Sequence, residues 1–179
     1  MKQINVPGID QVSEVSKLLF GQIKKSVGMV PNLYATIGYS PVALKAFLAF
    51  QETLSHGVFT AKEREAVALV VSEVNGCNYC LAAHTTTAMK TGFTKEDTKS
   101  IRHGLVEGEK LNAVVQLAKS IAENKGMPDE ILLDRFFEVG YNEAALMELV
   151  GLISVRIFTN YVYALTEIPI DFPEVEMFS

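Results

Sequence analysis

Both cysteines of the chain stand three residues apart, and a histidine follows four residues after the second. The two thiols are Cys77 and Cys80, and the histidine is His84. On an α-helix, residues three and four positions apart lie on one face, so this spacing predicts a dithiol beside a built-in base. Inside a reducing cell, two cysteines at this spacing are more often catalytic or metal-binding than a structural disulfide.

The same segment carries features that favour a thiolate, which is the reactive form of a cysteine. Cys77 follows Asn75 and Gly76 at the predicted start of a helix, where backbone N–H groups and the helix dipole favour an anion. His84 is able to take the thiol proton, and the second sulfur is able to trap the first once it is oxidised. Cysteines three residues apart on a helix also meet the Cα separation of a disulfide. We therefore expect a dithiol that cycles.

Glu65 lies twelve residues before Cys77, on the helix predicted to precede it. If the chain reverses between the two helices, they run antiparallel, and a rise of about 1.5 Å per residue brings Glu65 near the level of His84. A carboxylate there would hold the imidazole tautomer or draw off its proton, as activated nucleophiles commonly need. The spacing predicts a contact between Glu65 and His84.

Helix start and stop signals recur along the chain and the alternating pattern of strands does not, so we predict an all-α fold. The expected helices cover about 10–27, 31–38, 41–54, 60–75, 77–92, 94–104, 109–124, 128–140 and 142–165. The expected N-terminal caps include Asp10, Ser40, Thr60, Thr94 and Asn142, and proline opens the second and eighth helices (Pro31 and Pro128). The tail from Glu167 onward shows no periodicity.

Length and composition set the organisation of the chain. Its 179 residues suffice for one domain with a full core, so we predict a single domain over 1–179. The 49% hydrophobic content suggests that apolar surface is buried between subunits as well, and we expect a homo-oligomer with residues 142–165 partly intersubunit. The net charge of −5 and the dispersed lysines and arginines argue against nucleic acid and against an anionic membrane as partners.

The longest apolar run, Ala144 to Leu165, is long enough to span a bilayer. It contains Glu148, Arg156 and Asn160, and charges at membrane depth cost several kcal/mol. We therefore predict a central or interface helix and no membrane span. The first residues lack the apolar core of a signal peptide, so we expect the protein in the cytoplasm.

The spacing of the four reactive residues resembles the signature of the AhpD-like alkylhydroperoxidases in the carboxymuconolactone decarboxylase superfamily. That pattern is Glu65, eleven residues, the CxxC of Cys77 and Cys80, three residues and His84. Flanking segments resemble the peroxidase-related branch, namely Val30–Leu33, Ser40-Pro41, Lys62–Glu65, Ser72–Cys77 and Thr166–Pro173. The resemblance implies an all-helical AhpD-like fold, homo-oligomers that are often trimers or hexamers, and a cofactorless thiol peroxidase.

The resemblance also implies roles for the site residues. Cys80 attacks the peroxide, Cys77 resolves the product, and Glu65 and His84 form a proton relay. The position of Cys77 at a helix terminus favours Cys77 as the nucleophile instead, but adjacency to His84 supports Cys80 equally well, and the family pattern favours Cys80. One departure stands out, because the usual AhpD pattern has a histidine where this chain has Tyr79, and tyrosine is a poor base near pH 7.

These patterns predict an antioxidant oxidoreductase that reduces hydroperoxides. No dinucleotide, flavin or haem motif is present, so we expect no cofactor and electrons from a dithiol protein or lipoyl group. Zinc on Cys77, Cys80, His84 and Glu65 is an alternative, although structural zinc sites usually place CxxC on a loop. A redox sensor or interaction protein without peroxidase turnover is a second alternative. The decarboxylase branch is a third, although its members generally lack the CxxC.

Overall fold

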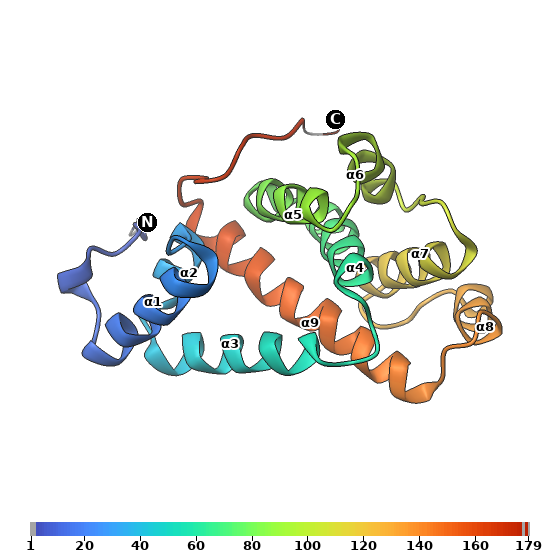
Figure 1. Ribbon diagram of the computed structural model, residues 1–179, viewed down its shortest axis with the longest axis horizontal. Coiled ribbons are helices and arrows are strands. Elements are labelled where there is room, and N and C mark those ends of the chain that lie inside the picture. Colours follow the sequence, from blue (N-terminus) through green and yellow to red (C-terminus); the bar gives the residue numbers. More distant parts are fainter. Residues whose placement is uncertain (1–2, 177, 179) are drawn as a thin grey trace.

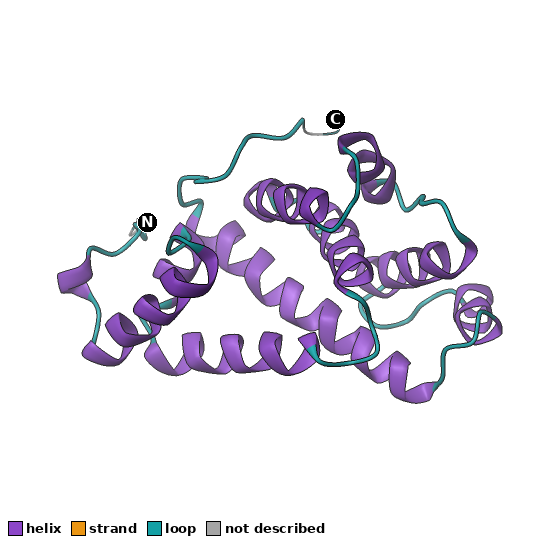
Figure 2. Ribbon diagram, in the orientation of Figure 1, coloured by secondary structure: helices purple, strands orange, loops and turns teal. Residues whose placement is uncertain are grey.

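The computed structural model describes residues 3–176 and 178 of the chain. This described part holds nine α-helices, one short 3-10 helix (Ile9–Gln11) and no strand, which confirms the predicted all-α fold (Figures 1 and 2). The α-helices are α1 Glu14–Val27, α2 Asn32–Ile37, α3 Pro41–Ser55, α4 Ala61–Val74, α5 Asn78–Lys90, α6 Lys95–Arg102, α7 Glu109–Glu123, α8 Glu130–Glu138 and α9 Glu143–Thr166.

Side-chain caps fix the starts of several helices where the sequence predicts them. The Ser40 hydroxyl accepts a hydrogen bond from the backbone N–H of Ala43 at the start of α3. At the start of α4, Thr60 and Glu63 form a reciprocal capping box, with Glu63 Oε2 2.7 Å from the Thr60 nitrogen. Each such cap stabilises its helix by about 1 kcal/mol. The caps therefore determine the residues at which α3 and α4 begin.

Three predicted helix starts are wrong. Asp10 belongs to the 3-10 helix, and α1 begins at Glu14, because the Ser13 hydroxyl accepts from the Ser16 N–H. Pro128 precedes α8, whose cap is Asp129, because only its carboxylate accepts from a first-turn N–H. Pro31 is likewise the N-cap of α2 and not its first helical residue.

Helix α4 is the element against which the site is built. It contacts α5, α6, α7 and α9, and its residues from Ala66 to Ser72 are all buried. In Figure 1, α1 and α2 lie at one end of the molecule and α7 and α8 at the other, with α9 running between them. Because this stretch is packed by neighbouring helices, α4 has little freedom to shift. Glu65 directly precedes the buried stretch, so its backbone position is fixed by the same packing.

Helix α9 is the one helix of the described residues that is long and apolar enough to cross a membrane by length and composition. About 39% of its most apolar stretch is buried within the molecule, and it packs against α3 and α4 as well as α2, α5 and α7. These contacts confirm the prediction of a central helix, whereas its intersubunit part stays a prediction. The packing brings Arg156 into the interior beside α3 and α5.

The segment after α9 has no regular structure but is tied to other elements. It leaves α9 at Glu167 and runs past α5 towards α6 (Figure 1). Ile168 is buried, and the Asn32 side chain donates a hydrogen bond to the Pro169 carbonyl at 3.1 Å. These contacts place residues 167–176, hereafter the tail, over the start of α2 and the start of α5.

Candidate active site

A tight turn places the CxxC beside the buried helix α4. Gly76 takes φ +61°, a left-handed conformation that glycine adopts at little cost, and the N–H of Cys77 donates to the Ser72 carbonyl at 2.9 Å. The chain reverses there, so α4 and α5 pack side by side. The reversal deduced from the sequence is confirmed, with Cys77 as the N-cap of α5 and not within it.

The two sulfurs form a disulfide between residues whose Cα atoms lie 5.3 Å apart. Both cysteines are almost fully buried, with 1% of Cys77 and 2% of Cys80 exposed. The backbone N–H of Cys80 donates to the sulfur of Cys77 at 3.3 Å, so the first sulfur occupies the free N–H end of α5. A cavity lies beside the disulfide, and Cys80 lines it whereas Cys77 does not.

His84 is held from both ring nitrogens. Its Nδ1 lies 2.8 Å from Glu65 Oε2, which is the contact that the sequence spacing predicts. Its Nε2 lies 2.9 Å from Nη1 of Arg156 on α9. Because a guanidinium only donates, Nε2 is the acceptor and the imidazole proton sits on Nδ1, where it is donated to Glu65. The arrangement therefore defines a neutral imidazole with its lone pair on Nε2.

The carboxylate of Glu65 is buried but remains ionised. Burial alone would raise the pKa of Glu65. The hydrogen bond from His84 and the charges of Arg156 and Arg64 outweigh burial and lower the pKa of Glu65 below its usual value. Glu65 is therefore an anion that orients the imidazole at neutral pH.

Arg156 is a site residue that the sequence analysis did not identify. Besides His84, it donates to the side-chain oxygen of Gln51 on α3 at 2.7 Å. Gln51 in turn contacts the Tyr34 hydroxyl at 3.4 Å. An arginine inside an apolar helix needs polar partners in the interior, and that requirement is the signal that could have identified it. The network links α2, α3, α5 and α9 around one imidazole.

Tyr79, in the place of the usual AhpD histidine, faces away from this network. Its hydroxyl donates to Asp171 Oδ1 at 2.5 Å and accepts from the Leu33 N–H at 3.2 Å. The other oxygen of Asp171 accepts from the Asn32 N–H at 2.8 Å. Burial, and then the hydrogen bond to Asp171, raise the pKa of Tyr79 far above its usual range. Tyr79 therefore ties the tail to α2 and α5 and is no base near neutral pH.

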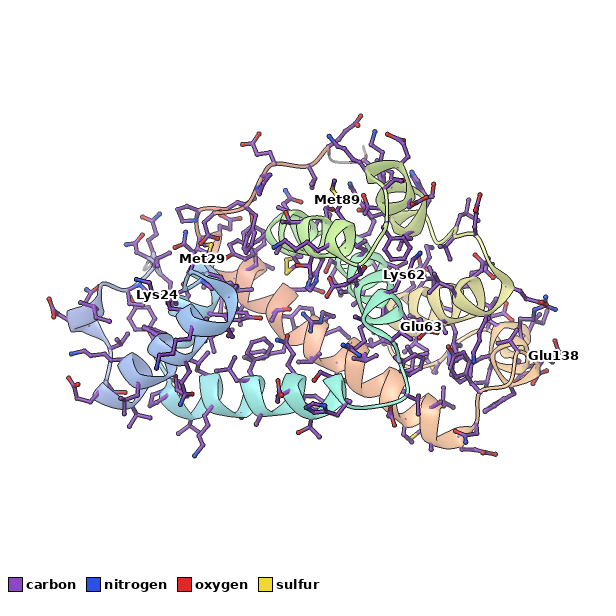
Figure 3. The ribbon with its side chains drawn as sticks, viewed as in Figure 1. Lys24, Met29, Lys62, Glu63, Met89 and Glu138 are labelled. Carbon is purple, nitrogen blue, oxygen red and sulfur yellow. A yellow bond between two sulfur atoms is a disulfide. The ribbon has the colours of Figure 1, made fainter. Side chains whose placement is uncertain are left out.

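A cavity of about 450 Å³ opens between these groups. Cys80, His84, Glu65 and Arg156 all contribute to its wall. Figure 3 draws the side chains as sticks, with Lys62 and Glu63 marking the first turn of α4 and Met89 marking the last turn of α5. The remaining lining comes from Ser26, Val27, Pro31, Leu33, Tyr34, Gln51, Ser55, Arg64, Tyr79, Ala83, Thr87, Lys90, Leu152, Val155, Thr159 and Phe172. A small molecule in this space would meet both a sulfur and a base.

The same residues can be tested as metal ligands. Within residues 3–176 and 178, no group of three or more His, Cys, Asp and Glu side chains is arranged to hold a metal ion. The sulfurs bond to each other, and Glu65 bonds to His84. The other two histidines lie outside the cavity lining, His56 against Glu52 at the end of α3 and His103 at the end of α6.

Comparison with known proteins gives the site a context. The Carboxymuconolactone decarboxylase family matches the chain over residues 41–122, which include all four candidate residues. A stretch of 64 residues is 42% identical to the alkyl hydroperoxide reductase AhpD of Coxiella burnetii (strain Dugway 5J108-111). That stretch covers 36% of this chain and 33% of the relative, so the match spans about a third of the curated relative's length.

Solved structures share the fold over almost the whole chain. The debrominase Bmp8, as a variant bound to 2,3,4-tribromopyrrole, superposes with a TM-score of 0.80 at 18% identity over 96% of this chain and 92% of its own. An uncharacterised peroxidase-related protein from Ralstonia eutropha JMP134, described as an AhpD core, gives a TM-score of 0.79 at 18% identity, covering 96% of this chain and 90% of its own. The chain is thus similar in sequence to the Carboxymuconolactone decarboxylase family and to AhpD over its central part, and it shares the fold of these solved structures over almost its whole length.

Proposed function

We propose that the protein is a thiol-dependent hydroperoxide reductase. Similarity to AhpD and to the Carboxymuconolactone decarboxylase family supports an enzyme of that type, and the CxxC supports the hydroperoxide reductase function. The observation that carries the proposal is the shared cavity, where Cys80 and His84 meet and where Glu65 holds the imidazole. No other pair of groups in the cavity combines a thiol with a neutral base.

In the first step, the reduced Cys80 gives its proton towards Nε2 of His84 and attacks one peroxide oxygen. The O–O bond breaks, the alcohol leaves with the proton, and Cys80 becomes a sulfenic acid. The hydrogen bond from His84 to Glu65 keeps the proton on Nδ1, so that Nε2 carries the lone pair. Arg156 must release Nε2 before that lone pair can accept a proton.

In the second step, Cys77 attacks the sulfenic sulfur, water leaves and the disulfide forms. The Cα separation of 5.3 Å suits this bond without movement of the backbone. An external dithiol then attacks the sulfur that faces the cavity, which is Cys80, and Cys77 leaves as a thiolate. The N–H of Cys80 and the N-terminus of α5 stabilise that thiolate, so the helix terminus favours Cys77 as leaving group and not as nucleophile.

The electron donor in this proposal is a dithiol protein or a lipoyl group in the cytoplasm. The Cys77–Cys80 disulfide exposes Cys80 to the cavity, and a dithiol that enters there returns the electrons by thiol exchange. A donor of this kind belongs to a reducing compartment, which agrees with the cytoplasmic location expected from the sequence.

We also propose that the protein acts as a homo-oligomer, with a trimer or hexamer favoured. Large apolar side chains of α9 are exposed to solvent in the single chain, including Met147, Tyr161 and Leu165 at 63%, 64% and 76%. Exposed apolar side chains on one helix are typical of a subunit interface. Light scattering should give a mass several times that of the chain, whereas a monomer across a wide concentration range would contradict this part.

A coupled turnover assay tests the proposed function. Purified protein is given cumene hydroperoxide with thioredoxin, lipoyl and small-dithiol donors, and metal content is measured on the same sample. Turnover with any dithiol, and none with NADH alone, is expected. Stoichiometric zinc with failure of every donor would favour a structural metal site, and a disulfide that forms without turnover would favour a redox sensor.

A further inference from the structure

The cavity contains an unusual balance of charge. Arg64, Lys90 and Arg156 all line it, and none of the three forms an ion pair with a carboxylate among the described residues. Every described ion pair of a lysine or arginine lies elsewhere on the surface or, for Arg102, against Glu73. Three cations that form no direct ion pair among the described residues thus face one space in a protein whose net charge is −5.

The one carboxylate in the cavity lining offsets only part of this positive charge. Glu65 is bonded to Nδ1 of His84, and the imidazole is neutral in that arrangement. The lining therefore carries three positive charges against one negative charge. A small, partly enclosed space of this sign raises the local concentration of anions.

The three cations differ in how many of their N–H groups already have a hydrogen-bond partner. Arg156 donates two of its N–H groups to His84 and Gln51, so it positions these two side chains. Arg64 donates one N–H to the Phe59 carbonyl and has further donors, and Lys90 is exposed with no hydrogen bond to the described residues. Arg64 lies in the first turn of α4 and Lys90 ends α5, so the antiparallel packing puts them at the same end of the helix pair.

The rest of the wall suits the body of an organic molecule. Apolar side chains from α2, α9 and the tail line it, including Leu33, Val155 and Phe172. A space of about 450 Å³ accommodates a molecule of several carbon atoms, which hydrogen peroxide would leave largely empty.

We propose that the preferred substrate is an organic hydroperoxide that carries a carboxylate. The carboxylate pairs with Arg64 and Lys90, the hydrocarbon body lies on the apolar wall, and the O–O group reaches Cys80. This inference rests on the proposed hydroperoxide reductase function and names its substrate class. The chemistry of the step is unchanged, so the carboxylate alters only binding and orientation.

Matched substrate pairs test the inference with the neutral donor dithiothreitol. Cumene hydroperoxide is compared with its para-carboxylate, and linoleic acid hydroperoxide with its methyl ester. We expect kcat/KM to be about tenfold higher for the carboxylates at low salt and the preference to shrink as salt is added. In R64Q and in K90Q the ratio of charged to neutral kcat/KM should fall towards one.

Two controls keep the result specific. K62Q removes one positive charge from the same turn of α4, where Lys62 lies over the Phe93 ring and outside the cavity lining, and it should keep the full preference. Calorimetry with the product alcohols needs no turnover, and the carboxylated alcohol should bind about tenfold more tightly than the neutral one. K90Q provides the same readout if R64Q fails to fold.

The outcomes separate the two proposals. Turnover of neutral and carboxylated hydroperoxides with equal kcat/KM would overturn this inference and leave the reductase function standing. Failure of every hydroperoxide would overturn both. The last arm compares the charged donor dihydrolipoate with the neutral donor dihydrolipoamide. If only this donor pair shows a charge preference, Arg64 and Lys90 bind the carboxylate of the reductant, and the substrate assignment is wrong.

Discussion

The cavity has two polar sides that behave differently. On the relay side, Glu65, His84 and Arg156 form a chain in which the imidazole proton and lone pair have defined places. On the tail side, Tyr79 bonds to Asp171, which also holds the start of α2. In each case a lining residue takes part in a hydrogen bond between a carboxylate and a ring-bearing side chain: Glu65 with His84, and Asp171 with Tyr79, where Tyr79 but not Asp171 lines the cavity.

The difference lies in what each ring can do with its proton. His84 has a lone pair on Nε2 that becomes available when Arg156 moves away, so this ring nitrogen is positioned to accept a proton. Tyr79 donates to Asp171 and accepts from Leu33, and its raised pKa keeps the proton in place. Tyr79, in the position where the AhpD pattern has a histidine, thus anchors the tail, and His84 is the histidine that the proposed mechanism uses as base.

The largest expected effect separates the two sulfurs on the relay side. Cys80→Ser should reduce peroxide consumption by at least about a thousandfold, because the attacking sulfur is lost. Cys77→Ser should still consume one equivalent and form a sulfenic acid that a dimedone-type probe labels, since only the resolving sulfur is missing. Labelling of the Cys80→Ser protein instead would reverse the two roles.

The second effect compares the two rings directly. His84→Gln should lower kcat/KM about a hundredfold near neutral pH and by much less at alkaline pH, where the thiolate forms unaided. Tyr79→Phe, which removes only a hydroxyl, should change kcat/KM by less than about threefold. Similar losses in both variants, or a His84→Gln loss that is independent of pH, would show that the two sides do not differ in the way described.

The third effect appears in stability. Tyr79→Phe leaves Oδ1 of Asp171 and the Leu33 N–H without a partner, so we expect the free energy of unfolding to fall by about 1–3 kcal/mol. Urea denaturation measures this loss. Asp171→Asn should show a smaller additional loss in the Tyr79→Phe background than in the wild type, and purely additive losses would contradict the link between the two side chains.

The smallest effect concerns the dependence of stability on pH. Glu65 has a lower pKa in the folded protein than its usual 4.5, so its contribution to stability is present above that pH and is lost as the pH falls through the lowered value. The wild type should therefore be more stable than Glu65→Gln near neutral pH, and this difference in unfolding free energy should shrink below pH 4.5. A difference that grows on acidification would show that the carboxylate is not stabilised by His84.

Local rules in the sequence account for most of the fold. Caps at Ser40 and Thr60, and the turn at Gly76, depend on neighbours within a few residues and are observed where expected. The contact between Glu65 and His84 was predictable because both residues lie on consecutive helices joined by a tight turn. Asp10 was misjudged as a cap because Ser13 nearby is an equally good one, and local preference does not rank them.

The parts of the site that were not predicted depend on distant contacts. Arg156 lies 72 residues from His84, and Asp171 lies 92 residues from Tyr79. Their pairing follows from how α9 and the tail pack on the α4–α5 hairpin, and no local pattern reports that packing. An arginine within an apolar helix showed that a polar partner must exist but not which one.

The most direct test of the account counts thiols after a single turnover. The reduced protein receives one equivalent of an organic hydroperoxide, free thiols are titrated under denaturing conditions, and the disulfide is located by mass spectrometry of peptides. The account predicts that both thiols disappear, that one alcohol forms, and that Cys77 and Cys80 are found linked. Two thiols that stay reduced while the peroxide is unchanged would contradict the proposed function.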